Sequence, residues 1–393
     1  MVNKYEELDV NAAIFHLNDS VSKVMVEVKN NNMLYKRNAE TMRFDGEVKV
    51  SFALSATEDF KHPRDTGSFY MLDGEVEEPI PVKSLTFEVK LNVKLGNTYW
   101  LRLETVDLNR KSRVQQIVPV VKVNRNSRQN FLLQSTEGPL YRPYLVKDQR
   151  IQIQTANADL QTLHVLCFQT PLKAALPPFS TKEPARPVNP DSTFVITGDK
   201  GRFYVMAPVK GFYFITPDPK SNEGFCVFTY DASFPAIHSA DEMIQTCRYM
   251  MYKEEYDSCM MASDKKLAID NFWMNIGGSH ERAREILKKY YERVMFANQQ
   301  FSSYMEGWKS DRGMVSIIFG PPTNVFKSAK DEIWVYGIES NPATLRFIFK
   351  KNTCPFSDND YSLERSELYK DAYYQAVDFW RQGIVYNENT ADR

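Results

Sequence analysis

Hydrophobic and polar residues alternate through the first third of the chain. The alternation is clear at 24–28, 48–54, 85–93 and 99–103. A period of two places one face of a strand in a core and leaves the other face in water. Turn-forming pairs such as Asp45-Gly46 separate these runs. The pattern of about seven short strands predicts an immunoglobulin-like β-sandwich over residues 1–124.

A second β domain is predicted over 125–235, with the polar stretch 124–130 as its linker. Its expected strands lie at 151–153, 163–168, 203–207, 211–215 and 225–228. The loop 171–190 interrupts them with six prolines in twenty residues. Because proline cannot donate to a strand ladder, this loop must be a surface excursion. Two interpretations stay open: an ordered loop packed on its own domain, or a polyproline-like arm that a partner grips.

Helical spacing replaces alternation from residue 236. We expect a helix at 239–256 opened by Ser239, one capped by Ser263 that stops at Gly277-Gly278, and one from Ser279 to about 303. A last helix, 366–381, ends at Gly383 and buries Leu368 among other residues. Strands are expected at 314–319, 332–336 and 345–349. The region 236–393 is therefore predicted to be an α+β domain, which makes the chain a multidomain protein, all-β first and α+β last.

Charge and cysteine content restrict the partners. A net charge of −1 argues against a general grip on nucleic acid or anionic membranes. No apolar run approaches the roughly 20 residues that span a bilayer. None of the five cysteines forms a CxxC pair, and their odd number leaves at least one thiol unpaired. A Cys167–Cys226 disulfide is the natural pairing if one forms, because both residues lie in predicted strands.

The densest local signal is the segment 307–325, GWKSDRGMVSIIFGPPTNV. Gly307 and Gly313 bracket a tight loop in which Trp308 is a large anchor. Asp311 and Arg312 are available for hydrogen bonds that hold the loop in shape. A buried strand is expected after the loop, ended by Gly320-Pro321-Pro322.

This segment resembles the signature of the GWxTD-domain family, which is found mostly in proteins of Bacteroidetes and related bacteria. The family motif is Gly-Trp-any-Thr-Asp, usually followed by Arg-Gly, a strand and Gly-x-Pro. Ser310 stands where the family has threonine, so the hydroxyl is kept and a methyl is lost. The stretch Pro177-Pro178-Phe179 also looks like an upstream feature of the family, and it is the candidate partner arm. The matching motif residues are Gly307, Trp308, Asp311, Arg312, Gly313, Gly320 and Pro322.

The resemblance implies an exported protein, often an outer-membrane lipoprotein that faces the periplasm, with no assigned catalytic activity. It further implies that an export signal and a lipidated cysteine precede Met1 in the native protein. We expect the motif loop, Gly307, Trp308, Ser310, Asp311, Arg312 and Gly313, to be either structural or a binding loop.

The sequence contains little evidence of a catalytic site or a metal site. A serine nucleophile at Ser310 needs a base, and only folding could bring His238 or His280 to it. No His or Cys residues occur at metal-ligand spacing, and the acidic stretch 357–364 lacks the glycine of a calcium loop. Phosphate-binding glycine patterns are missing too. No cofactor and no metal is therefore expected.

The function predicted from these observations is a non-catalytic binding or scaffold protein of the bacterial cell envelope, in an outer-membrane-associated complex such as secretion or assembly machinery. Its partners would be envelope proteins, with no nucleic acid, and membrane contact only through a lipid anchor. The alternative is a hydrolase or ligand-binding protein acting on envelope polymers. The hydrolase would require Asp311 and a second acid, Glu306 or Asp331, about 5 to 9 Å apart.

Overall fold

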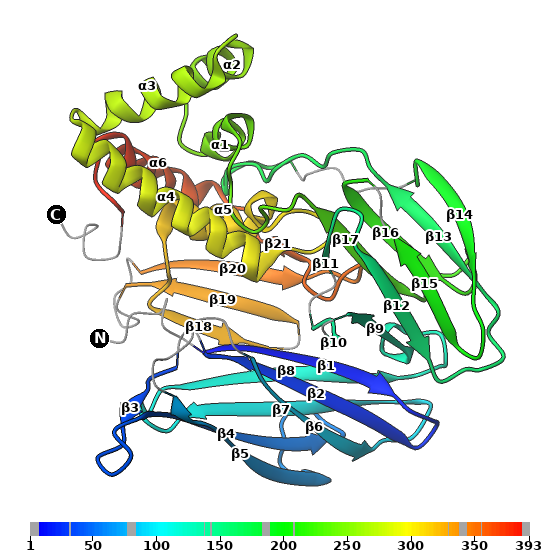
Figure 1. The fold of residues 1–393 in the computed structure, drawn as a ribbon. Helices are drawn as coiled ribbons and strands as arrows, with labels where there is room; N and C mark the ends of the chain where they lie inside the picture. Colours follow the sequence, from blue (N-terminus) through cyan, green and yellow to red (C-terminus); the bar gives the residue numbers. More distant parts are fainter. Residues whose placement is uncertain are drawn as a thin grey trace.

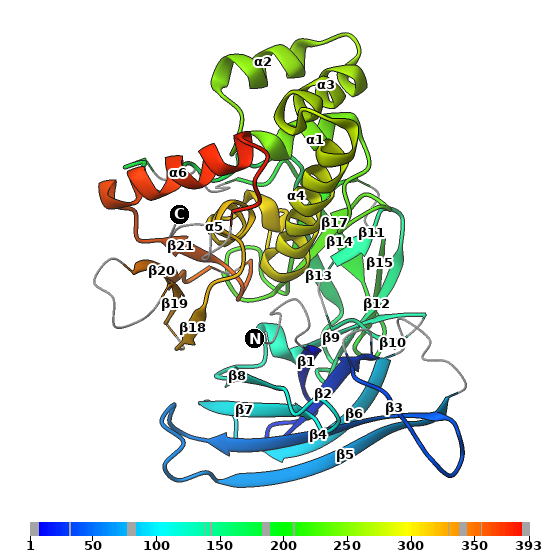
Figure 2. The ribbon, with the colours of Figure 1, turned by 90° about the vertical axis from the view of Figure 1, so that its left-hand side faces the viewer.

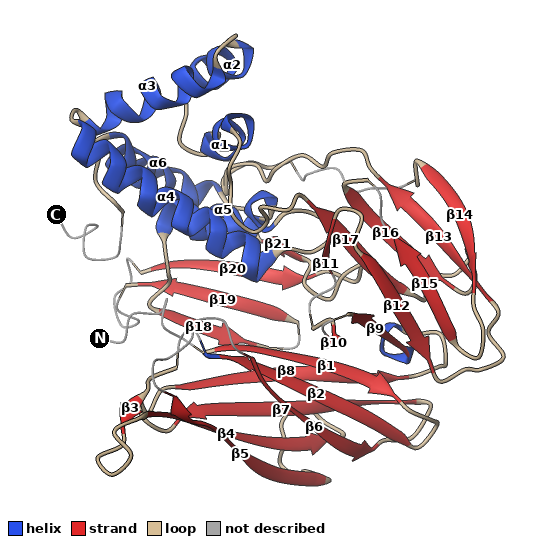
Figure 3. Ribbon diagram, in the orientation of Figure 1, coloured by secondary structure: helices blue, strands red, loops and turns tan. Residues whose placement is uncertain are grey.

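The computed structural model describes residues 8–30, 33–76, 84–136, 138–141, 144–182, 189–206, 209–328, 330–337, 344–354 and 356–386. Strands make up the first half of the chain, and the α-helices gather in its last part (Figure 3). The predicted order, β-rich first and α+β last, is confirmed.

Two antiparallel sheets with one shared core form the N-terminal region. One has the order β1-β2-β6; the other has the order β3-β4-β7-β8, with β5 paired to β4. Val26, Leu54 and Leu101 in this core are fully buried, at the positions that the alternation marks as inward. The strands are β1 (Asp9–His16), β2 (Val21–Lys29), β3 (Lys36–Arg37), β4 (Phe44–Ser55), β5 (Asp65–Val76), β6 (Ser84–Asn92), β7 (Asn97–Asp107) and β8 (Arg113–Lys122).

A buried polar chain crosses this region. The Lys122 ammonium donates to Ser22 Oγ at 3.2 Å, and Ser22 Oγ lies 2.7 Å from His16 Nδ1. His16 Nε2 lies 2.9 Å from the Val121 carbonyl oxygen, so a neutral imidazole donates there and accepts from Ser22. Burial, together with the charge of Lys122, lowers the pKa of His16 from 6.5 to about 4.

Acidification is therefore expected to destabilise the N-terminal region. His16 is protonated near pH 6.5 in the unfolded chain and only near pH 4 in the folded chain. The stability that the neutral His16 contributes is therefore complete above pH 6.5 and is lost as the pH falls from 6.5 to about 4. The loss amounts to roughly 3 kcal/mol by pH 4. Urea unfolding at stepped pH should show this slope, and His16→Gln should flatten it. Equal slopes for the two proteins would contradict the expectation.

The second β region is a two-sheet unit with its own core. One sheet has the order β10-β9-β12-β15 and the other β11-β17-β16-β13-β14, in which only β11 and β17 run parallel among the described pairs. The strands are β9 (Phe131–Ser135), β10 (Gly138–Pro139), β11 (Tyr144–Val146), β12 (Arg150–Thr155), β13 (Thr162–Phe168), β14 (Ser192–Thr197), β15 (Arg202–Met206), β16 (Gly211–Thr216) and β17 (Phe225–Tyr230).

The suggested Cys167–Cys226 disulfide is wrong, since all five cysteines are free thiols. Cys167 on β13 faces the core between the two sheets, whereas Cys226 on β17 faces a second cluster on the outer side. Strand β16 also separates the two strands. Their side chains therefore point to opposite faces of one sheet and cannot bond.

The stretch 124–130, predicted as a linker, is an ordered and partly buried junction. It contains a 3-10 helix, Arg128–Asn130. The Asn130 amide donates to Asn124 O at 3.0 Å and to Ser127 Oγ at 2.8 Å. Arg128 donates to Asp358 in the C-terminal region at 2.5 Å. Specific contacts therefore hold the regions together at this junction.

Six α-helices and a four-stranded sheet form the described C-terminal region. The sheet, in the order β18-β19-β20-β21, lies between the helices and the N-terminal region in both views (Figures 1 and 2). The elements are α1 (Ala240–Cys247), α2 (Lys253–Met261), α3 (Lys265–Gly277), α4 (His280–Phe301), α5 (Asp311–Phe319), β18 (Asn324–Lys327), β19 (Asp331–Tyr336), β20 (Leu345–Lys351), β21 (Tyr361–Leu363) and α6 (Lys370–Arg381).

Helices begin where the sequence predicts at the positions of two serine N-caps. Ser239 caps α1 through a capping box with Glu242, and Ser279 caps α4. Three details were wrong. The segment 239–256 is interrupted between α1 and α2, Asp264 rather than Ser263 caps α3, and Leu368 is 87% exposed.

Candidate functional site

The motif segment connects α4 to α5. A 3-10 helix, Gly307–Lys309, follows α4, and Ser310 caps α5. The predicted strand 314–319 is wrong, because these residues belong to α5. All nine residues of α5 are buried, so its apolar run shows no amphipathic period. A short continuous apolar run cannot by itself distinguish a buried strand from a buried helix.

Both motif glycines are required by close backbone approaches. A Cβ on Gly307 would lie 1.9 Å from the carbonyl oxygen of Ala297 in α4. A Cβ on Gly313 would lie 1.9 Å from the carbonyl oxygen of Gly307. The two glycines thus let α4, the 3-10 helix and α5 cross in direct backbone contact.

Trp308 anchors this crossing. Its side chain is buried, and its ring meets Tyr249 edge-on at 6.2 Å between centroids. The Trp308 backbone N–H donates to Asn298 Oδ1 at 3.1 Å, and its carbonyl accepts from the Tyr249 hydroxyl at 2.9 Å. Trp308 therefore ties α4 to the segment that follows α1.

Ser310 is an N-cap. Its Oγ accepts from the backbone N–H of Gly313 at 3.0 Å and donates to the Gly307 carbonyl at 2.7 Å. Threonine offers the same hydroxyl, which explains why serine can replace it here.

We expect Ser310→Thr to leave the stability of the chain nearly unchanged and Ser310→Ala to cost about 1 kcal/mol. Alanine leaves the Gly313 N–H without its acceptor at the start of a buried helix. Urea unfolding followed by tryptophan fluorescence measures both effects. A larger loss for threonine than for alanine would show that the hydroxyl is not the decisive group.

Asp311 forms a buried ion pair with Arg365, with side chains 7% and 9% exposed. Its second carboxylate oxygen accepts from the backbone N–H of Leu363 at 2.9 Å. Arg365 also donates to the carbonyl oxygens of Leu176 and Pro177, at 2.9 and 2.7 Å. Asp311 thereby orients the cation that holds the loop 171–190.

Arg312 is the centre of a second buried pair. It donates to Glu332 Oε1 at 3.2 Å and to the Asn359 carbonyl at 3.0 Å, with the Tyr361 ring 4.0 Å away. Burial raises the pKa of Glu332, but the charges of Arg312 and Lys327 and the hydrogen bond from Trp334 together outweigh it, so the net pKa is lowered. Glu332 is therefore held as the charged partner of Arg312.

A family model of the GWxTD domain matches residues 211–382. The chain contains a GWxTD domain. The match begins at β16, before the predicted boundary at 235. An aromatic cluster joins β16 to the C-terminal region: the Phe212 ring lies 5.7 Å from the ring of Tyr304 and 5.2 Å from that of Phe356. The outer face of the second β region is thus packed on the rest of the GWxTD domain.

Among solved structures, Escherichia coli alpha-2-macroglobulin activated by porcine elastase matches at 12% identity, covering 56% of this chain and 23% of that one. The TM-score of 0.14 is too low to support a shared fold. No curated protein matches the chain.

The candidate partner arm, Pro177, Pro178 and Phe179, contacts the GWxTD domain of its own chain. Pro178 is buried, and its carbonyl accepts from the Ser366 N–H at 3.3 Å. The Phe179 ring lies 5.8 Å from Tyr373 and 5.3 Å from Tyr374. Upstream, the Ala175 N–H donates to the Lys309 carbonyl at 2.7 Å. The arm thus packs on the C-terminal region and not on its own β region; residues 183–188 of the loop lie outside the described chain.

Sequence reasoning missed several residues that hold the motif. Arg365, Glu332 and Asn298 gave no signal, because each binds a partner outside its own helix or strand. Arg293 did offer one, because it lies three residues after Tyr290 and four before Ala297, both of which are apolar and buried on α4. It donates to the carbonyls of Ile317 at 3.0 Å and Tyr386 at 2.6 Å, and so satisfies the end of α5.

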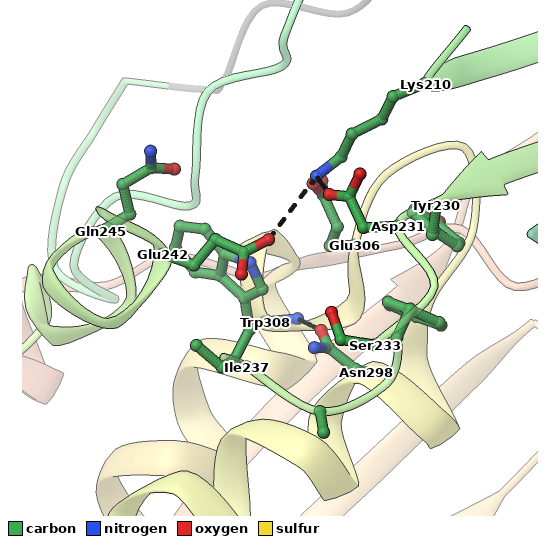
Figure 4. Close-up of a pocket in the computed structure, with 12 residues that line it drawn as sticks. Lys210, Tyr230, Asp231, Ser233, Ile237, Glu242, Gln245, Asn298, Glu306 and Trp308 are labelled. Carbon is green, nitrogen blue, oxygen red and sulfur yellow. Dashed lines mark hydrogen bonds and ion pairs between the residues drawn. The ribbon is translucent and has the colours of Figure 1, made fainter. Parts of the chain in front are cut away.

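A small hollow lies where β17, α1 and the motif meet (Figure 4). Lys210 reaches into it from the β15–β16 connection, with Nζ 2.9 Å from Asp231 and 3.5 Å from Glu306. Lys309 also binds Glu306, at 2.8 Å. The hollow has a volume of about 30 Å³, enough for two or three water molecules and too small for a sugar or a nucleotide.

No group of three or more His, Cys, Asp or Glu residues that could hold a metal occurs in the described ranges. Within the same part of the chain, every helix is too short or too polar to cross a bilayer.

Proposed function

We propose that the chain is a non-catalytic binding or scaffold protein of the bacterial cell envelope. It would face the periplasm as part of an outer-membrane-associated complex, with secretion or assembly machinery as the concrete case and a lipid anchor as its membrane link. The observation that carries this proposal is that Ser310, Asp311 and Arg312 all bind groups inside their own domain. A motif whose polar groups are bound in this way stabilises the fold of its domain. Recognition of a partner would then depend on residues at the protein surface.

The acids named for a hydrolase each have a cationic partner. Asp311 pairs with Arg365, Glu306 with Lys309, and Asp331 with Lys350 at 3.0 Å. A general acid needs a raised pKa. Burial raises the pKa of Glu306, yet the nearby Lys309 and Lys210 bring it below its ordinary value. Bonds from Ser328 and Lys350 lower the pKa of Asp331. These environments oppose the protonation step that hydrolysis requires.

An apolar surface beside the arm is the best candidate for recognition. Leu368 is 87% exposed and Tyr374 is 48% exposed. Tyr374 meets Phe179 of the docked arm, and Leu368 lies two residues after Ser366, whose N–H donates to the Pro178 carbonyl. We call Phe179, Leu368 and Tyr374 the arm patch. Exposed aliphatic and aromatic side chains at one place favour contact with a protein.

Cross-linking in intact cells, followed by affinity purification of the tagged full-length protein and mass spectrometry, tests the proposal. We expect one or two envelope proteins in fixed proportion, and at least a fivefold loss of them in Leu368→Glu. Met261→Glu is the matched control, because Met261 is 83% exposed on α2, outside the arm patch. Recovery of the protein alone would overturn the scaffold role. Equal recovery with both variants would overturn the arm patch only.

A further inference from the structure

Strand β14 forms an open edge of the five-stranded sheet. Its only hydrogen-bonded strand partner in the described chain is β13, and it lies outermost in the sheet (Figure 1). Phe194 is 38% exposed and Val195 is 53% exposed. Phe194 pairs with the inward-facing Val165, so its exposure means that the core of this region is open at the edge.

The pairing register shows which backbone groups point outward. Gly198 N–H donates to Gln161 O at 2.9 Å, which marks these residues as a hydrogen-bonded pair with β13. Hydrogen-bonded and non-hydrogen-bonded pairs alternate along an antiparallel ladder. The backbone groups of Phe194 and Ile196 are therefore hydrogen-bonded to β13. The backbone N–H and C=O groups of Thr193, Val195 and Thr197 therefore point away from β13, in the plane of the sheet, toward its open edge.

Nothing in the sequence of β14 blocks another strand. Natural edge strands are usually protected by lysine, proline or a bulge. The six residues of β14, STFVIT, include no charge and no proline. They are rich in β-branched side chains, which suit a paired strand.

The outward residues are also self-complementary. An antiparallel pairing about a two-fold axis at Val195 places Thr193 opposite Thr197 of a second copy, and Val195 opposite its own equivalent. Phe194 then faces Ile196 of the second copy. Threonine pairs and aromatic with β-branched pairs are the favourable cross-strand combinations. No two like charges oppose each other between positions 193 and 197.

We infer that β14 pairs with β14 of a second copy of this chain, with the two-fold axis at Val195. The pairing joins two five-stranded sheets into one and covers Phe194. Its ladder spans five residues on each chain, so the dimer is weak and forms at high local concentration, such as on a membrane surface or in an assembly.

Sedimentation of the full-length protein from roughly 1 to 500 μM tests the inference. We expect a reversible dimer and at least a tenfold weaker association for Val195→Lys, which places two ammonium groups opposite each other. Tyr204→Lys on the neighbouring β15 is the matched control, because Tyr204 is 49% exposed and lies outside β14. An equimolar mixture of Val195→Lys and Val195→Glu should associate again. A wild-type chain that stays monomeric overturns the inference, as does a dimer that Val195→Lys leaves intact.

Cysteine cross-linking tests the register. Under mild oxidation, Val195→Cys should give a covalent dimer, since facing residues in this position lie about 5.5 Å apart. Thr193→Cys should give no covalent dimer above the wild-type background. In the paired strands, residue 193 of the second copy lies opposite residue 197, about 13 Å along the strand from residue 193 of the first. Cross-linking of Thr193→Cys in place of Val195→Cys would exclude the two-fold axis at Val195.

Discussion

Gly313→Ala is expected to destabilise the GWxTD domain by about 3 kcal/mol, at the upper end for added volume in a packed interior. The new methyl group would meet the Gly307 carbonyl oxygen at 1.9 Å. This neighbour is backbone and cannot change rotamer, so α5 must move away from the 3-10 helix. Movement of α5 also disturbs the Asp311 and Arg312 pairs in its first turn.

Gly278→Ala is the matched control. Gly278 ends α3 with a φ of +70°, and nothing lies within 4 Å of a Cβ there. Alanine at this site strains the backbone without a collision and should cost about 1 kcal/mol. Urea unfolding followed by fluorescence compares the two variants, because Trp273, Trp308, Trp334 and Trp380 all lie in the C-terminal region. Equal losses would mean that the close approach at Gly313 relaxes easily.

Asp311→Ala is expected to cost about 3 to 5 kcal/mol, because it leaves a buried guanidinium without its counter-charge. Arg365 is only 9% exposed, and the Leu363 N–H loses its acceptor as well. A second readout is specific to the arm. Arg365 holds the Leu176 and Pro177 carbonyls, so amide exchange at 174–179 should become faster in the variant.

Two controls separate the ion pair from a general effect of charge removal. Asp331→Ala breaks the Asp331–Lys350 pair, whose side chains are 26% and 49% exposed, and should cost less than about 1 kcal/mol. The double variant Asp311→Ala/Arg365→Met should recover part of the loss, because it removes both buried charges. A loss below about 1 kcal/mol for Asp311→Ala would contradict the role of the pair.

The motif acquires a physical explanation from these contacts. Gly307 and Gly313 allow three backbone segments to cross, Trp308 fills the space beside the crossing, and Ser310 starts α5. Asp311 and Arg312 then bind partners far along the chain. The signature is therefore a set of packing requirements, and a hydroxyl at position 310 is enough because it both accepts from the Gly313 N–H and donates to the Gly307 carbonyl.

Local patterns in the sequence were sufficient for most secondary structure. Alternation placed β2, β4, β6 and β7, because inward and outward positions repeat along one strand. Capping chemistry placed the starts of α1 and α4, since it depends on a few neighbouring residues. The family resemblance was likewise visible in a short segment, 307–325.

Long-range contacts decided the rest. The strand predicted at 314–319 is a helix because it is buried on all sides and has no period to read. The arm at 177–179 rests on Arg365 and Tyr373, almost two hundred positions away, and no local pattern can specify such a partner. The stretch 124–130 is polar as a linker would be, yet Arg128 binds Asp358 and makes it a junction. The sequence by itself determined the local elements and the motif, because these depend on neighbouring residues. Only the tertiary structure decided what the motif holds together, because its polar side chains find their partners across the fold.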